Sequence, residues 1–222
     1  MKVSTVAQMR NLDKSATEEF GISQELLMEN AGQAVYFVIL KEFGVKNKKF
    51  AVFCGGGNNG GDGLVVARKI HSNGSEAKVF LLDDETKFKG AAKRNFEIAS
   101  KMPIEISKVS SIESVKSAVL NSDAIVDAMF CTGLTREVNG IYKDVIQMIN
   151  ESKKSVFSVD IPSGINGDTG EVMGTAVKAD YTITFGLPKI GNMLYPGYDR
   201  CGKLYVSHIS FPPSHYNTDT IK

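Results

Sequence analysis

The stretch Gly55-Gly56-Gly57-Asn58-Asn59-Gly60-Gly61-Asp62-Gly63 follows an apolar run, Phe50–Cys54, and precedes a helix-like segment, Leu64–Ile70. A β-strand that leads through a glycine-rich turn into a helix is a common phosphate site in α/β proteins. The turn exposes backbone N–H groups, and the helix N-terminus attracts negative charge. The spacing of Gly55, Gly57 and Gly60 fits G-x-G-x-x-G, although glycine-dense turns also produce this pattern by chance. The stretch therefore predicts an α/β fold with a ligand site after its first strand.

Two amides and a carboxylate distinguish this turn from an ordinary dinucleotide-binding turn, which needs only small residues. Asn58, Asn59 and Asp62 fall within the predicted loop. Such groups indicate recognition chemistry or ion coordination in addition to phosphate binding. The alternative is a tight strand-to-helix turn in which Asp62 is an ordinary residue of the helix N-terminus.

The composition favours one soluble α/β domain. A chain of 222 residues can bury one substantial core. Its formal net charge of +1 gives no support for binding to nucleic acid or to an anionic membrane. The N-terminus lacks the apolar core of a secretion signal, and the longest apolar run, Val35–Leu40, is too short to span a bilayer. Cys54, Cys131 and Cys201 form no Cys-x-x-Cys pair, which argues against a disulfide framework or a zinc site. We expect a cytoplasmic protein.

Residues 1–48 read as a helical extension that precedes the first strand. Thr5 and Gln8 make a capping box for a helix that runs through Phe20, and Ser23 caps a second helix. A simple nucleotide-binding unit does not need these helices. We expect them to cover an edge or a face of the sheet, or to form a dimer contact.

Residues 49–211 alternate between short apolar runs and helical stretches, and residues 212–222 form a polar tail. This alternation predicts a Rossmann-like three-layer α/β/α sandwich with a mostly parallel, doubly wound sheet. No convincing helix separates the last two strands. These strands extend the sheet edge, with an antiparallel member as one alternative. The expected strands lie near residues 50–54, 77–82, 104–106, 124–127, 155–160, 181–185 and 204–207, and the helices near residues 64–72, 89–100, 111–121 and 142–151.

Polar motifs follow three of the expected strands, at the sheet edge where open α/β proteins bind ligands. Besides the glycine-rich stretch, these are Asp127–Arg136 and Asp160–Gly164. Oxygen atoms of Asn59, Asp127 and Ser163 suit an alkali or alkaline-earth cation better than zinc. Asp160 is then available as a general acid or base. Either aspartate alone could instead be a cap for a neighbouring loop.

Four motifs together closely resemble the YjeF N-terminal domain family, the NAD(P)H-hydrate epimerases. They are G-G-G-N-N-G-G-D-G, V-D-A-M-F-C-T-G-L, S-V-D-I-P-S-G-I and T-F-G-L-P-K-I-G. The resemblance runs from the N-terminal helices to about Phe211. It implies a homodimeric enzyme of metabolite repair that interconverts the R and S epimers of hydrated NADH and NADPH (NADHX and NADPHX). In many members this domain is fused to an ATP- or ADP-dependent dehydratase.

The resemblance also implies a set of site residues. A potassium ion would be held by Asn59, Asp127 and Ser163. Cys131 departs from the pattern, because the family usually has glycine there. A cysteine would be strained if the loop needed a positive φ, and it would narrow the pocket. Substrate contacts would come from Asn58, Asn59, Gly60, Gly61, Asp62, Cys131, Thr132, Gly133, Leu134, Thr135, Arg136, Glu137 and Asp160.

The reaction itself needs little beyond one well-placed acid or base. The hydrate carries a hydroxyl on a ring carbon next to nitrogen, so acid-assisted loss of hydroxide gives a planar iminium that water attacks from either face. Asp160 is the first candidate for proton transfer. Lys189 is the second, and its alternative is an ordinary surface lysine beside a turn.

Two other functions stay open at this stage. A nicotinamide-dependent oxidoreductase would use Gly55, Gly57 and Gly60 for pyrophosphate and Asp83 for the ribose hydroxyls. That interpretation leaves Asp127 unexplained. The third possibility is a non-catalytic module that binds a nucleotide-like ligand or a protein partner.

Overall fold

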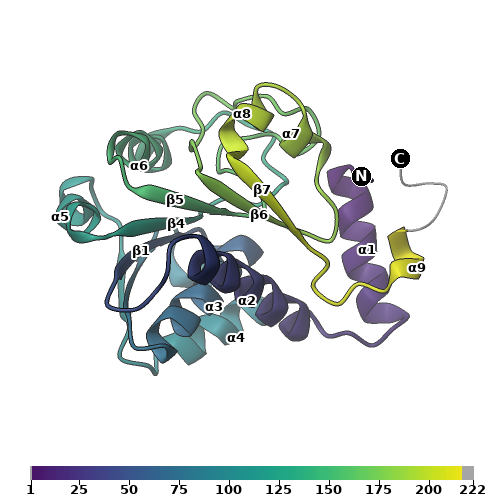
Figure 1. Ribbon diagram of the computed structural model, residues 1–222, viewed down its shortest axis with the longest axis horizontal. Helices are drawn as coiled ribbons and strands as arrows, with labels where there is room; N and C mark the ends of the chain where they lie inside the picture. Colours follow the sequence, from purple (N-terminus) through teal and green to yellow (C-terminus); the bar gives the residue numbers. More distant parts are fainter. Residues whose placement is uncertain (1, 217–222) are drawn as a thin grey trace.

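A parallel sheet of seven strands forms the centre of the part of the chain that the structure, a computed structural model, describes: residues 2–216. The strand order is β3-β2-β1-β4-β5-β6-β7, and every neighbouring pair is parallel (Figure 1). The central pair runs in register from Phe50 opposite Ala124 to Cys54 opposite Ala128. The strands are β1 (Lys49–Cys54), β2 (Glu76–Leu81), β3 (Glu105–Lys108), β4 (Ala124–Ala128), β5 (Ser155–Val159), β6 (Tyr181–Phe185) and β7 (Lys203–Ser207).

Helices cover both faces of this sheet, which confirms the expected three-layer sandwich. One layer contains α2 (Gln24–Glu42), α3 (Asn58–Ser72) and α4 (Gly90–Ala99), and the other contains α5 (Glu113–Asn121) and α6 (Gly140–Glu151) (Figure 1). Side chains of β1 alternate between the two cores, as strand geometry requires. Val52 packs with the first layer and Phe53 with the second.

The last strand is parallel, so the antiparallel alternative was wrong. Two short helices, α7 (Ile190–Met193) and α8 (Gly197–Cys201), lie between β6 and β7 and make the crossover. A short 3₁₀ helix (Glu85–Lys87) follows β2, and α9 (Pro213–Tyr216) follows β7. Residues 217–222 of the expected tail lie outside the described residues. No helix within residues 2–216 is long and apolar enough to cross a membrane.

The N-terminal helix α1 (Val6–Glu18) lies beside the sheet rather than over it (Figure 1). The residues before it pair with the segment that follows β6. The N–H of Ser4 donates to the Pro188 carbonyl at 2.9 Å, and the Ile190 N–H donates to the Ser4 carbonyl at 3.0 Å. The predicted capping box is present: Thr5 N–H donates to Gln8 Oε1 at 2.8 Å, and Gln8 N–H donates to Thr5 Oγ1 at 3.1 Å. The helix ends two residues before the predicted Phe20.

The glycine-rich stretch differs most from expectation, because α3 begins at Asn58 and takes up the predicted loop. Close packing explains the glycines. A Cβ on Gly60 would lie 1.9 Å from the carbonyl oxygen of Gly55, and one on Gly63 would lie 2.7 Å from Cβ of Ala128. Only glycine lets the start of this helix approach β1 and β4 so closely. Asn58, Asn59 and Asp62 are therefore helical residues.

Candidate active site

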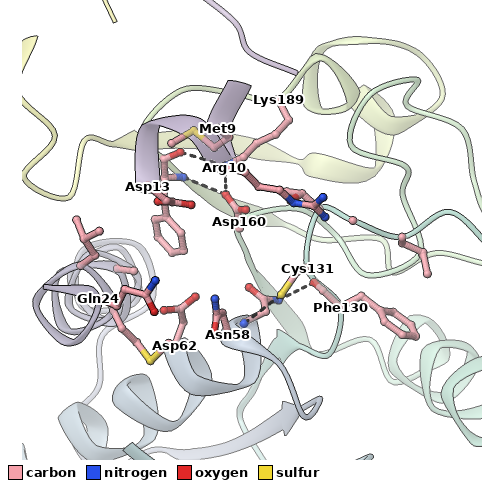
Figure 2. A pocket seen from close by; sticks show the side chains of 18 of the residues that line it. Met9, Arg10, Asp13, Gln24, Asn58, Asp62, Phe130, Cys131, Asp160 and Lys189 are labelled. Atoms are coloured by element: carbon pink, nitrogen blue, oxygen red, sulfur yellow. Dashed lines mark hydrogen bonds and ion pairs between the residues drawn. The ribbon is translucent and has the colours of Figure 1, made fainter. Parts of the chain in front are cut away.

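A cavity of about 580 Å³ opens at the carboxyl ends of the strands, which is where open parallel sheets bind ligands. Its walls come from α1, α2, the start of α3 and the segments after β4, β5 and β6 (Figure 2). Gly60, Gly61 and Glu137 do not line this cavity, and neither do Asp127 and Ser163. The structure brings together these predicted site residues: Asn58, Asn59, Asp62, Cys131, Thr132, Gly133, Leu134, Thr135, Arg136, Asp160 and Lys189.

Asp160 and Lys189 form an ion pair in the wall of the cavity. The Lys189 ammonium donates to Asp160 Oδ1, and the same oxygen accepts from Thr184 Oγ1 at 3.0 Å and from the Phe185 N–H at 3.1 Å. All these hydrogen bonds fall on Oδ1. Oδ2 is therefore the carboxylate oxygen left available to a ligand.

The backbone of Asp160 is also unusual, because its φ is +67°. Aspartate tolerates this left-handed conformation better than most residues. The Asp160 N–H still donates to the Ile183 carbonyl, at 2.7 Å, so the turn stays anchored to β6. Such strained backbone is concentrated at functional sites in proteins.

Lys189 is a buried residue, which excludes the alternative of a surface lysine. Its side chain is 1% exposed. Besides Asp160, its ammonium donates to Thr184 Oγ1 at 3.1 Å and to the Phe185 carbonyl at 3.0 Å. A buried ammonium needs this full set of acceptors, so the pair with Asp160 is part of the fold as well as of the site.

Two further carboxyl groups, Asp62 and Asp13, face the same cavity (Figure 2). Asp62 is 8% exposed, and burial, followed by the charges of Asp160 and Asp13, raises its pKa well above the usual value. Asp13 is more exposed; desolvation raises its pKa to about 6, while the charge of Lys189 lowers it and that of Asp160 raises it.

Sequence reasoning missed the contribution of α1, which brings Met9, Arg10 and Asp13 to the cavity. The signal was present in the spacing. Positions i and i+3 or i+4 share one face of a helix, so a buried Met9 places Asp13 on that same side. The expected role of this extension was to cover an edge or a face of the sheet or to form a dimer contact.

The three residues predicted to hold a cation lie close together around the backbone of Phe130, with Asn59 at the cavity wall and Asp127 and Ser163 outside it. The carboxylate of Asp127 is fully buried and accepts from Ser163 N–H at 2.9 Å, Ser163 Oγ at 2.5 Å and Ser158 Oγ at 2.8 Å. The Phe130 N–H donates to Ser163 Oγ at 3.0 Å, and Asn59 Nδ2 donates to the Phe130 carbonyl at 2.8 Å.

Asp127 has no ion pair with any residue in the range 2–216. Burial raises its pKa, although hydrogen bonds from Ser163 and Ser158 act in the opposite direction. The described part of the chain also contains no cluster of three or more His, Cys, Asp or Glu residues suited to a metal ion. A cation here would rely on neutral oxygens and one carboxylate.

Cys131 fits its position without the strain that was considered for it. It is not among the non-glycine residues with positive φ. Its Sγ accepts from the Asn59 N–H at 3.2 Å, so the thiol lies over the first turn of α3. Cys131 is an exposed residue, but desolvation of its sulfur raises the thiol pKa to about 11.

Asp83, the ribose-binding candidate of the oxidoreductase interpretation, has a structural role outside the cavity. It does not line the cavity. Its carboxylate accepts from the Gly56 N–H at 3.0 Å, Tyr142 Oη at 2.6 Å and Lys87 Nζ at 2.6 Å. Asp83 therefore holds the glycine-rich turn in place.

Comparisons with known proteins agree on one family. The model of the family described as "YjeF-related protein N-terminus" matches residues 24–191. A protein of Limosilactobacillus reuteri named NAD(P)H-hydrate epimerase is 39% identical, with 93% of this chain and 95% of that protein covered. A protein of the same name from Elusimicrobium minutum is 34% identical, with 96% and 97% covered.

Longer relatives match as well. A bifunctional NAD(P)H-hydrate repair enzyme (Nnr) of Thermofilum pendens is 47% identical over 96% of this chain, which spans only 41% of that enzyme. Among solved structures, the crystal structure of yeast ynu0 superposes with a TM-score of 0.85 at 22% identity, with 98% of this chain and 93% of that chain covered, which supports the fold. These matches, together with the cavity at the carboxyl ends of the strands, show that the chain belongs to the YjeF N-terminal family.

Proposed function

We propose that this chain is an isomerase that epimerises the R and S forms of NADHX and NADPHX, a step in the repair of hydrated nicotinamide cofactors. The Asp160–Lys189 pair in the wall of the cavity carries the proposal, because it places a carboxylate beside a space where a ring could sit. Its support from the comparisons is the name NAD(P)H-hydrate epimerase, which is printed for relatives of similar length.

The substrate lies across the cavity in this proposal. The first turn of α3 offers the side chains of Asn58, Asn59 and Asp62 to the substrate, while its Asn59 N–H is used by Cys131 Sγ. The segment from Cys131 to Arg136 forms the facing wall, and Glu137 continues it outside the cavity. Arg10 of α1 adds a second guanidinium to that of Arg136 on the cavity wall, which suits an anionic dinucleotide.

Asp160 transfers the proton, and Lys189 keeps it oriented. Lys189, Thr184 and the Phe185 N–H hold Oδ1, so Oδ2 faces the ligand in a fixed direction. Loss of the ring hydroxyl gives a planar iminium, and addition of water to the other face gives the opposite epimer. A positioned carboxylate that exchanges the proton of this water is sufficient for the base half of the reaction.

A potassium ion held by Asn59, Asp127 and Ser163 is part of the proposal. The residues fit such an ion, because Asp127 is a buried carboxylate without a cationic partner among residues 2–216 and the neighbouring donors are oxygens. A bound ion would offset the Asp127 charge and fix the segment around Phe130. Gly60 and Gly61 would act by allowing close approach of the helix rather than through side-chain contacts.

The partners follow from the chemistry. A dehydratase that accepts one epimer would consume the product, and some relatives carry the name of a bifunctional repair enzyme. We propose that such an activity works with this one, whether fused or separate. A homodimer and a cytoplasmic location, where reduced cofactors accumulate damage, complete the proposal.

Chromatographic separation of the R and S hydrates over time, with and without the protein, tests the function. We expect faster equilibration of the epimers, with no change in redox state and no consumption of cofactor. Equal rates in both samples would exclude an epimerase. Reduction of an added substrate with oxidation of NADPH would favour the oxidoreductase instead.

A further inference from the structure

Two carboxyl groups of the cavity have opposite surroundings. Asp160 is paired with Lys189 and accepts two further hydrogen bonds on Oδ1. Asp62 is 8% exposed, yet its carboxyl makes no hydrogen bond or ion pair with any residue in the range 2–216. It lines the cavity and points into it from α3 (Figure 2). A buried polar group without a partner is costly, so this one indicates an interaction with a ligand.

The groups around Asp62 decide its protonation. Asp13 faces it from α1 and Asp160 from the end of β5, and both carry negative charge when ionised. Lys189 acts in the other direction but is already paired with Asp160. Cys54 and Cys131, the neighbouring thiols, stay neutral because burial raises the pKa of each. Burial and the two carboxylates therefore outweigh Lys189, and the pKa of Asp62 is raised well above its usual value.

We propose that Asp62 is the general acid of the epimerisation, a role that rests on the proposed function. Two carboxyl groups with opposite surroundings divide the acid and base roles in many enzymes. Asp62 and Asn58 lie on one side of the cavity, and Asp160 and Lys189 lie on the other (Figure 2). Epimerisation needs groups on both faces of a planar ring, and this arrangement provides them.

Asp62 gives its proton to the hydroxyl oxygen of the hydrate, the C–O bond breaks with its electron pair on oxygen, and water leaves. The lone pair of the ring nitrogen forms the C=N bond of the iminium. Water then adds to the opposite face, the π electrons return to nitrogen, and the proton of this water goes to Oδ2 of Asp160. Proton exchange with solvent restores both groups before the next turnover in the same direction.

The test uses the full chain with Asp62→Asn, and with Asp144→Asn as a matched control for loss of one carboxylate on the exposed surface of α6. The rate of epimer equilibration is measured from acidic to alkaline pH. We expect the wild-type rate to fall on the alkaline side, where Asp62 loses its proton. Asp62→Asn should be about 10²-fold slower at neutral pH and lose this alkaline fall, while Asp144→Asn follows the wild type.

Binding of NADPH, measured by calorimetry, separates the acid role from a binding role. Asparagine keeps the size and polarity of the side chain, so we expect Asp62→Asn to bind NADPH as the wild type does. Wild-type turnover and pH profile in this variant would overturn the proposal, and so would a loss of rate explained entirely by lost binding. Failure of the proposed function looks different, because the wild-type protein itself would then not equilibrate the epimers.

Thermal unfolding gives a readout that does not depend on turnover. The unfolded chain loses the Asp62 proton near pH 4, whereas the folded chain keeps it to much higher pH. The wild type therefore loses stability relative to Asp62→Asn as the pH rises above about 4. A Tm difference that widens with pH is expected. A difference independent of pH would show that Asp62 is ionised in the folded protein and would overturn its role as an acid.

Discussion

Asp160 combines a left-handed backbone with a carboxylate held on one oxygen. Asparagine tolerates the same backbone conformation and accepts similar hydrogen bonds, so Asp160→Asn should keep the fold. It cannot take a proton from water. We expect turnover to fall by about 10²-fold while NADPH binding stays close to normal. The epimer-separation assay and calorimetry measure the two effects.

Near-normal turnover in a folded Asp160→Asn protein would show that Asp160 does not transfer the proton, and Lys189 would be the next candidate. Lys189→Met is then the informative variant, since it removes the ammonium and keeps much of the side-chain volume. Its stability must be measured first, because breaking a buried ion pair costs about 3–5 kcal/mol.

Asp127 is the acceptor for several buried donors from Ser158 and Ser163. Asp127→Ala leaves those donors unpaired, at a cost of about 1–3 kcal/mol for each group that finds no other partner. We expect weaker NADPH binding, a more mobile segment from Cys131 to Glu137, and loss of any response to potassium. Calorimetry in potassium chloride and in choline chloride makes the comparison. A variant that still responds to potassium as the wild type does would place the ion elsewhere.

The sequence predicted Asp160 and Asp127 because each stands at a strand end, and strand ends share one edge of a parallel sheet. It pointed to Lys189 through the motif that resembles the family. It missed Asp13, which reaches the cavity because α1 packs against a distant apolar cluster and because Ser4 pairs with the segment around Lys189. That pairing joins positions far apart in the chain. No local pattern of residues 1–20 contains it.

Helix α1 owes its position to a small apolar cluster that includes Met9, Leu12, Leu27 and Phe211. Leu12→Ala creates a cavity in that cluster and should lower the free energy of unfolding by about 2–5 kcal/mol. The loss should mainly weaken the packing of α1 against the rest of the molecule. We expect faster hydrogen exchange of α1 amides and weaker NADPH binding, with β1 and β4 still protected. Leu120→Ala is the matched control, since Leu120 is 60% exposed on α5.

Exchange rates that rise equally in α1 and in the central strands would mean that the whole molecule unfolds as one unit. An unchanged affinity for NADPH, together with a loosened α1, would remove Arg10 and Asp13 from the binding surface.

The start of α3 shows why element boundaries were harder to predict than element types. Glycine has a poor helix propensity, so six residues that include Gly60, Gly61 and Gly63 read as a loop. Tertiary packing reverses that preference, because larger residues would collide with Gly55 and Ala128. The helices α7 and α8 were not predicted for another reason, because they are too short to show a helical period.

At the scale of the molecule, the cavity takes its walls from both the extension and the core. We propose that residues 1–48 and 49–211 form one functional unit. The general plan of the sheet was predictable, since alternating strands and helices admit few topologies. The direction of its last strand was not, because the crossover helices left no clear pattern.

The stability of the molecule should depend on pH through two carboxyl groups, Asp13 and Glu29, whose pKa values are shifted in opposite directions. The pKa of Asp13 is raised to about 6, so between pH 3.8 and about 6 the folded state binds more protons than the unfolded state and loses stability as pH rises. Burial alone raises the pKa of Glu29, but hydrogen bonds from Lys69 and Arg68 outweigh it and lower the pKa. That group stabilises the fold above its ordinary pKa and loses this effect in acid.

Asp13→Asn isolates the first effect. We expect the variant to gain Tm relative to the wild type as pH rises from about 4 to about 6, with a constant difference at higher pH. Thermal melts across this range measure it, and Asp144→Asn controls for the change in net charge. Parallel curves for wild type and Asp13→Asn would contradict the raised pKa.

The pairing of Ser4 with Pro188 and Ile190 has a consequence for how the protein is made. Ser4 is synthesised more than 180 residues before Pro188 and Ile190, so this pairing forms only after the later segment has been made. The cavity reaches from Met9 to Ile209, so a nascent chain that has not yet released β7 has no complete wall. The complete cavity therefore forms only after the segment that contains Ile209 has been synthesised.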